Sequence, residues 1–367
     1  MTARPSARNR SATGTIAGFV LRLARESIPL TQRGMAEALS VDLGTVQGRE
    51  SGRRPLANMK AGDLLDMRRR LLTLGADRTA LGLLDAAMDA DRIIGAALDP
   101  PEWPGLHPLA GWVHTRDTAH MIAWAVNGTP PPGLRHPISA RRGPVAAAPV
   151  MGARDRDAFF ANLRNAVDMA SGAADGRALL HRQALYLTSY DPSPEANAWT
   201  AQALHARRGL FAAQGGSPRW AQARSIATAL ARRGDPVPLL DFIDRSIADD
   251  EAAEAANLNY WAYWMGALRE PQPNDAFMAD RGLTGWDPAT LLRGLAQGFH
   301  ESPGYVDLYA HSLWALLTAH TWLPQASPAI ARALADRVAS LLDGGSVSPR
   351  SRRELSAVHY VLSDHQH

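Results

Sequence analysis

The chain has 367 residues, of which 46% are hydrophobic and 20% charged, and its formal net charge is +3. It is apolar enough to bury the cores of two or three domains, which excludes a disordered protein, and it has no apolar run of about 18 residues that would predict a transmembrane helix. The absence of cysteine excludes disulfides and thiolate zinc sites and leads us to expect a cytoplasmic protein.

Positive charge is concentrated at the start of the chain. Residues 1–74 contain 13 Arg and Lys against 6 Asp and Glu, a net charge of +7, whereas the remaining residues contain 26 against 30, a net charge of −4. A basic module attached to a mildly acidic body favours a polyanionic partner for the first module only, and a solvated basic surface is the alternative.

The first module is predicted to be a basic arm followed by a helix. Residues 1–13 are polar and basic, so they either follow a phosphate backbone or form an ordinary frayed terminus. Apolar residues at helical spacing then predict a helix over 15–26, which ends before Pro29.

Two short helices joined by a tight turn come next. Thr31 is placed to cap a helix that runs to Leu39. Asp42 is placed to cap a second one that runs to about Ser51, where Gly52 stops it. This pattern is typical of a small helical domain that presents one helix to the major groove of DNA.

A further helix from about 56 to about 72 completes a domain that we place at 14–76. Residues 77–153 are interpreted as a helical connector with proline-rich segments. One amphipathic helix is predicted within it at about 115–126, and residues 134–152 are predicted to be a flexible linker.

From residue 154 to 367 the pattern is helix after helix, with Pro, Gly or Asp-Pro at most breaks. The predicted segments are 155–171, 175–190, 194–214, 217–233, 235–249, 251–269, 287–301, 303–320, 327–343 and 348–363. Helix pairs recur at roughly 35–45 residues, which favours a stacked array of hairpins like tetratricopeptide repeats. A non-repeating bundle is the alternative, and in either case the expected fold class is all-α.

One set of residues in the first module occurs in a characteristic order without gaps. It consists of Leu21, Arg22, Arg25, Leu30, Thr31, Gln32, Met35, Ala36, Leu39, Ser40, Val41, Thr45, Val46, Gln47, Glu50, Ser51, Gly52, Arg53, Arg54 and Pro55. On these residues the segment 16–74, about a sixth of the chain, resembles the helix-turn-helix domain of the xenobiotic-response-element family, the regulators similar to phage repressors and Cro. The resemblance implies a five-helix domain that binds double-stranded DNA with its third helix in the major groove.

The resemblance also implies which residues of the third helix read the bases. The groove-facing positions are Leu43, Gly44, Thr45, Gln47 and Gly48. Because hydrogen-bonding side chains are few, Gln47 would pair with adenine, Leu43 or Thr45 would touch a thymine methyl group, and DNA shape would supply part of the specificity. The two glycines suggest a close backbone approach to DNA, or contacts made by a neighbour such as Arg49.

Other positions are implied to contact phosphates or to hold the domain together. The residues assigned to phosphates are Gln32, Arg53 and Arg54, and Arg33 is also placed among the DNA-binding residues. Gln32 stands at a helix N-terminus, which aids anion binding, and Arg53 and Arg54 have a solvated loop as the alternative. Arg25 and Glu50 are implied to form a partly buried ion pair, with two solvated charges as the alternative.

Four aromatic residues fall within the five positions 260–264. They cover most of a helix circumference, which is typical of a central helix buried on several sides. The other interpretation is the wall of a pocket for a small-molecule or peptide effector. The residues assigned to this pocket are Asn257, Tyr260, Trp261, Trp264, His311 and Trp314. Arg207 and Arg208 would add charge for an acidic ligand, unless they lie on a solvated helix face.

The sequence carries no pattern that predicts catalysis, so we expect no enzyme, no metal site and no cofactor. No His-Glu-x-x-His motif, nucleophile elbow or glycine-rich phosphate loop is present. We expect a sequence-specific transcriptional regulator that binds an inverted repeat as a homodimer, with residues 154–367 for dimerisation and effector sensing. The alternative is an interaction scaffold whose helical region binds a partner protein while the first domain localises it.

Overall fold

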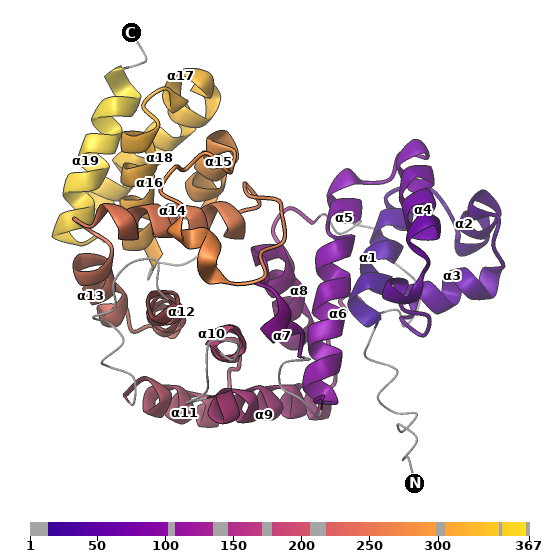
Figure 1. Ribbon diagram of the computed structural model, residues 1–367. Coiled ribbons are helices and arrows are strands. Elements are labelled where there is room, and N and C mark those ends of the chain that lie inside the picture. The colour runs from indigo at the N-terminus through magenta and orange to yellow at the C-terminus, as the bar shows by residue number, and fades with distance from the viewer. Residues whose placement is uncertain are drawn as a thin grey trace. The chain divides into compact units, whose positions relative to one another are not determined.

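The computed structural model is helical throughout (Figure 1). It describes residues 14–101, 107–134, 146–170, 178–205, 218–298, 305–344 and 347–364. Within these ranges every regular element is a helix and no strand occurs, which confirms the all-α prediction. None of the helices in these ranges combines the length and the apolar character needed to cross a membrane. The predicted arm at 1–13, residues 135–145 of the predicted linker, Arg207 and Arg208 lie outside the described residues.

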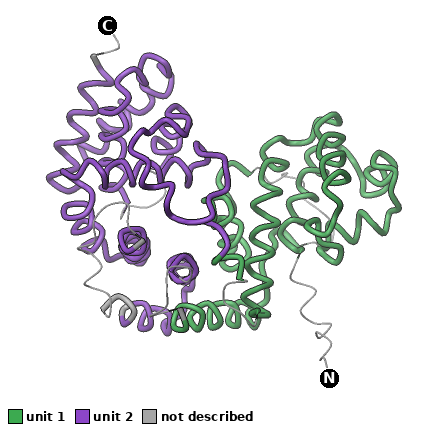
Figure 2. The backbone as a smooth tube through the Cα atoms, in the orientation of Figure 1, with its two compact units in different colours: residues 1–110, 114–169 green, residues 111–113, 170–367 purple. Residues whose placement is uncertain are grey.

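The chain forms two compact units (Figure 2). The first comprises residues 1–110 and 114–169, and the second comprises residues 111–113 and 170–367. Almost all of the predicted connector at 77–153 therefore belongs to the same unit as the predicted domain at 14–76.

The early helices of the first unit begin and end close to the predicted residues. The helices up to residue 170 are α1 (Thr15–Glu26), α2 (Gln32–Leu39), α3 (Leu43–Glu50), the 3-10 turn η2 (Leu56–Asn58), α4 (Ala61–Thr73), α5 (Arg78–Gly82), α6 (Leu84–Leu98), α7 (Pro108–Gly111), α8 (Arg116–Asn127) and α9 (Ala153–Ala170). Thr31 caps α2 and Asp42 caps α3, as expected, by accepting hydrogen bonds from backbone amides of the first turn. Residues 56–72 do not form one helix, because η2 is followed by extended backbone at Met59 and Lys60 before α4 begins.

Helices of the predicted connector complete the core of the first unit. α6 packs against both α1 and α8. Phe19 of α1 meets Trp124 of α8 edge to face, with ring centroids 5.1 Å apart, and both side chains are buried. Asp91 of α6 is buried against the N-terminus of α1. Through these contacts, residues of the predicted connector bury α1.

The second unit contains helix pairs around a shared core. Its elements are α10 (Ala178–Thr188), α11 (Pro194–His205), α12 (Pro218–Arg232), α13 (Val237–Ser246), α14 (Glu251–Trp264), η6 (Asp275–Ala279), α15 (Pro288–Gly298), α16 (Val306–Ala319), α17 (Leu323–Ala326), α18 (Pro328–Gly344) and α19 (Pro349–Asp364). The consecutive pairs α12–α13, α15–α16 and α18–α19 pack together, as a hairpin array predicts. However, α16 also contacts α13, α14 and α19, as expected of a bundle.

Candidate nucleic-acid interface

One side of α3 is fixed to the core and the other side is open. Val46 is fully buried, and Asp42 accepts hydrogen bonds from both the amide and the hydroxyl group of Thr45, at 2.7 and 2.5 Å. On the opposite side Gly44 and Gln47 are exposed. Because they stand three residues apart on a helix, they lie on the same face. On this face, Gly44 and Gln47 are accessible to a binding partner.

Arg54 covers two of the positions that were predicted to face the groove. Its Nη1 donates a hydrogen bond to Thr45 Oγ1 at 2.6 Å, and a methyl group at Gly48 would come within 3.0 Å of Arg54 Cδ. Thr45 and Gly48 are buried as a result, so the prediction that they are exposed is wrong. The glycine makes room for an arginine of the same chain.

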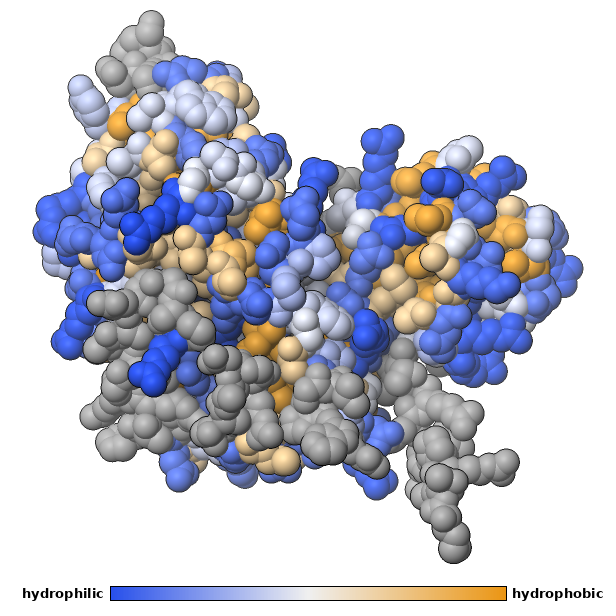
Figure 3. Space-filling model, in the orientation of Figure 1, coloured by the Kyte–Doolittle hydropathy of each residue, from blue (hydrophilic) through white to orange (hydrophobic). Residues whose placement is uncertain are grey.

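Exposed arginines border the open face of α3. Three arginines are exposed here: Arg33 in the first turn of α2, and Arg53 and Arg54 after α3. Leu43 and Arg49 of α3 are half-buried. Burial lowers the pKa of Arg49. On the face shown in Figure 3 the surface around α3 is mainly hydrophilic, with hydrophobic residues among the hydrophilic ones towards α2. We use the name α3 surface for Arg33, Gly44, Gln47, Arg53 and Arg54 together.

A buried hydrogen-bonded cluster joins α1, α2 and α3 behind this surface. Arg25 donates from Nε and Nη2 to the two carboxylate oxygens of Glu50, at 2.5 and 3.1 Å. Gln32 Nε2 donates to Glu50 Oε2 at 2.7 Å, so this amide orients a carboxylate inside the protein. The prediction for Gln32 was a contact with a DNA phosphate. Burial lowers the pKa of Arg25, but the hydrogen bond and charge of Glu50 outweigh it and raise the pKa above its ordinary value.

Sequence reasoning missed the residue at which α1 and α3 cross most closely. A methyl group at Gly18 would lie 2.4 Å from the carbonyl oxygen of Arg49 and 2.7 Å from that of Glu50. Only glycine permits this approach of the two backbones, which fixes the C-terminal end of α3 against α1. The available signal was an isolated glycine inside an apolar helical pattern, where glycine costs about 1 kcal/mol relative to alanine.

Asp91 is the second residue that sequence reasoning missed. Its two carboxylate oxygens accept hydrogen bonds from the backbone amides of Ile16 and Ala17, at 3.0 and 2.9 Å. Gly14, the N-cap residue of α1, has no side chain to do this, so the cap comes from α6. Burial raises the pKa of Asp91 to about 7, although the amide hydrogen bonds act in the opposite direction.

Three of the predicted pocket residues lie together in the second unit, next to an arginine that was not predicted. Asn257, Tyr260 and Trp261 are buried in α14. The guanidinium group of Arg224 from α12 lies over the Tyr260 ring, 3.9 Å from its centroid. Trp264 is half-buried and stacks on Tyr260, with ring planes 18° apart. The buried-helix interpretation is therefore confirmed for α14, and the pocket interpretation stays a prediction.

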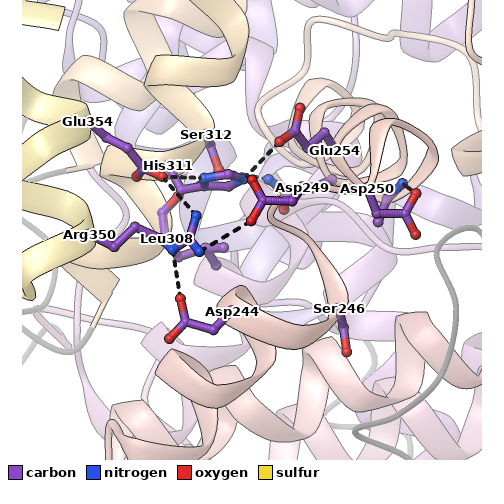
Figure 4. A network of polar contacts seen from close by, with 12 residues as sticks. Asp244, Ser246, Asp249, Asp250, Glu254, Leu308, His311, Ser312, Arg350 and Glu354 are labelled. Atoms are coloured by element: carbon purple, nitrogen blue, oxygen red, sulfur yellow. Dashed lines mark hydrogen bonds and ion pairs between the residues drawn. The ribbon is translucent and has the colours of Figure 1, made fainter. Parts of the chain in front are cut away.

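His311 belongs to a different cluster, which links α14, α16 and α19 (Figure 4). Its Nδ1 lies 2.9 Å from Glu354 Oε1 and its Nε2 lies 3.9 Å from Glu254 Oε1. Arg350 also approaches Glu354, at 3.9 Å. Trp314 packs near His311, with ring centroids 5.7 Å apart. These contacts form a polar cluster beside Trp314, and Trp314 packs against the same apolar core as Tyr260 and Trp261.

No protein-family model, curated protein or solved structure matches this chain. Within the residues that the structure describes, no group of three or more His, Asp and Glu side chains could hold a metal ion.

Proposed function

We propose that this chain is a sequence-specific DNA-binding transcriptional regulator whose α3 enters the major groove. The observation that carries the proposal is the α3 surface, where the open face of a helix anchored on its other side is bordered by three exposed arginines. Gln47 would read base edges, and the arginines would contact phosphates on either side of the groove. The resemblance of residues 16–74 to repressor-like domains supports the same placement.

The proposal includes a homodimer on an inverted repeat. α3 has eight residues and is about 12 Å long, so one copy reads only a few base pairs. A single small module buries too little surface for tight, specific binding, and a two-fold dimer doubles the contacts. The second unit is the part of the chain that we propose for dimerisation.

Selection from a library of random DNA duplexes tests the proposal without knowledge of the operator. The full-length chain should enrich a single motif with two-fold symmetry, and footprinting should show a protected site about 20 base pairs long at moderate salt. Recovery of random sequences, or binding that disappears at physiological salt, would contradict sequence-specific regulation.

Gln47→Ala should weaken binding to the selected motif by about 1–3 kcal/mol and relax the preference at one or two base positions. The reason is that Gln47 is the exposed amide on the open face of α3. Gln202→Ala, at an exposed glutamine of α11, is the matched control and should leave the affinity unchanged. Selection repeated with both variants measures the base preference, and an unchanged motif for Gln47→Ala would remove this residue from the interface.

The double replacement of Arg53 and Arg54 by alanine should weaken binding to all DNA sequences alike. Two fewer phosphate contacts should reduce the slope of log K against log [salt] by about 2. Arg69→Ala with Arg70→Ala is the control, because it removes two exposed arginines from α4 of the same unit. Fluorescence anisotropy at several salt concentrations gives both slopes, and equal slopes for the two double variants would contradict the assignment.

A further inference from the structure

The second unit places Arg224 and Arg232 in a cluster of aromatic side chains without a carboxylate partner among the described residues, whereas the nearby Arg182 has one. Arg182 is 3% exposed and pairs with Asp275, its Nη2 lying 2.5 Å from Oδ1. Arg224 is 2% exposed, and neither it nor Arg232 forms an ion pair with any described carboxylate. An arginine stays charged in proteins, and an unpaired buried charge costs several kcal/mol. Such an arrangement requires a compensating partner.

Three side chains contact the guanidinium group of Arg224, and one of its nitrogen atoms has no hydrogen-bond partner. Its guanidinium group lies 3.9 Å from the ring centroid of Tyr260 and 4.8 Å from that of Trp261. Its Nε donates to Asn257 Oδ1 at 3.2 Å. Its buried Nη2 has no hydrogen-bond partner. Burial also lowers the pKa of Arg224, which reflects the cost of its uncompensated charge.

A second buried donor beside it is also unsatisfied. Trp261 is 3% exposed, and its indole Nε1 has no hydrogen-bond partner. Buried polar groups are nearly always paired in proteins. Arg224 Nη2 and Trp261 Nε1 are both donors, belong to adjacent side chains and share the absence of an acceptor. Both can donate to an oxygen atom, and the guanidinium group favours one that carries negative charge.

The neighbouring arginine adds positive potential to the same region. Arg232 lies over the Tyr190 ring, 4.2 Å from its centroid, and donates to the hydroxyl groups of Tyr186 and Tyr305. Burial raises the pKa of Tyr305, and both Arg232 and Arg224 oppose this rise, which places the two cations near one hydroxyl group. The Tyr305 hydroxyl group accepts a hydrogen bond from Arg232 and donates one to the carbonyl oxygen of Thr228, so its bonds are made within the protein.

We propose that Arg224 and Trp261 bind an oxyanion, the carboxylate or phosphate group of a small ligand, in the second unit. The oxyanion accepts hydrogen bonds from Arg224 Nη2 and Trp261 Nε1, and Asn257 holds the guanidinium group in place. Asn257 is itself fixed, because its Nδ2 donates to Ser312 Oγ at 2.8 Å. This site goes beyond DNA binding and does not depend on it.

Thermal unfolding of the full-length chain without DNA tests the site. Sodium chloride is replaced stepwise by sodium acetate in one series and by sodium phosphate in another, at constant ionic strength and pH 7. We expect a saturable rise in the midpoint in one of the two series, roughly 5–10 °C at an anion concentration 100-fold above Kd. The series that responds identifies the source of the oxyanion. Equal midpoints in chloride, acetate and phosphate would overturn the proposal.

Two variants with matched controls locate the effect. Trp261→Phe keeps an aromatic ring and removes one donor, so the anion should bind about 10- to 100-fold more weakly, whereas Trp322→Phe at an exposed tryptophan should have no effect. Arg224→Met should abolish the anion response, and Arg332→Met at an exposed arginine should retain it. If Arg224→Met does not fold, the tryptophan pair decides the question. A response that persists unchanged in Trp261→Phe would overturn the assignment.

Discussion

Replacing Glu50 by alanine should lower the free energy of unfolding of the first unit by about 3–5 kcal/mol. The substitution leaves the buried guanidinium group of Arg25 without its carboxylate, and it removes the acceptor of Gln32 as well. Breaking a buried ion pair costs more than the pair contributes, because the remaining charge keeps its desolvation penalty. Urea unfolding followed by circular dichroism measures the change.

Two comparisons separate this mechanism from a general loss of a side chain. Glu37→Ala, at an exposed glutamate of α2, should change the free energy of unfolding by less than about 0.5 kcal/mol. The double variant Arg25→Met with Glu50→Met should be less destabilised than Glu50→Ala, since no unpaired charge remains. A single variant as stable as the Glu37→Ala control would show that Arg25 and Glu50 are not a buried pair.

The same cluster shows what local sequence signals could and could not predict. The caps at Thr31 and Asp42 were predictable because the side chain bonds an amide only a few residues away. Gln32 bonds Glu50, which is 18 residues distant, and no local rule selects that partner over a phosphate. Arg54 likewise folds its long side chain back over Gly48, so the exposure of α3 depended on a residue outside the helix.

Distance along the chain also explains the two larger differences between prediction and structure. The connector was separated from the helix-turn-helix segment because Gly75 was predicted to end that segment, yet α6 and α8 bury its first helix. An arginine in a helix usually predicts a solvated face. Arg224 is buried instead, because Tyr260 and Trp261 of another helix cover its guanidinium group. Apolar periodicity predicts where such helices lie along the chain, but it does not predict which helices pack against each other.

The stability of the first unit should decrease as pH rises from about 4 to about 7 because of Asp91. The pKa of this carboxyl group is raised from its ordinary value of 3.8 to about 7 in the folded protein, so the folded state holds a proton that the unfolded state has already released. The stabilisation is complete below the unfolded pKa and is lost as pH rises through the folded pKa. The slope reaches about 1.4 kcal/mol per pH unit, or about 4 kcal/mol over the whole interval.

Asp91→Asn removes the titrating group and keeps its shape, so the variant should lack this part of the pH dependence. At pH 5 the folded natural chain holds a protonated carboxyl group, which like the amide offers Ile16 and Ala17 one acceptor oxygen that carries no hydrogen, so no loss of hydrogen bonds separates the two proteins there. The variant should gain about 2–3 kcal/mol of stability relative to the natural chain between pH 5 and pH 8, because only the natural chain loses the stabilisation of its bound proton. Asp85→Asn, at an exposed position of the same helix, should shift stability by less than about 1 kcal/mol. Urea unfolding at pH 5, 6, 7 and 8 gives the three curves, and parallel curves for the natural chain and Asp91→Asn would contradict a raised pKa.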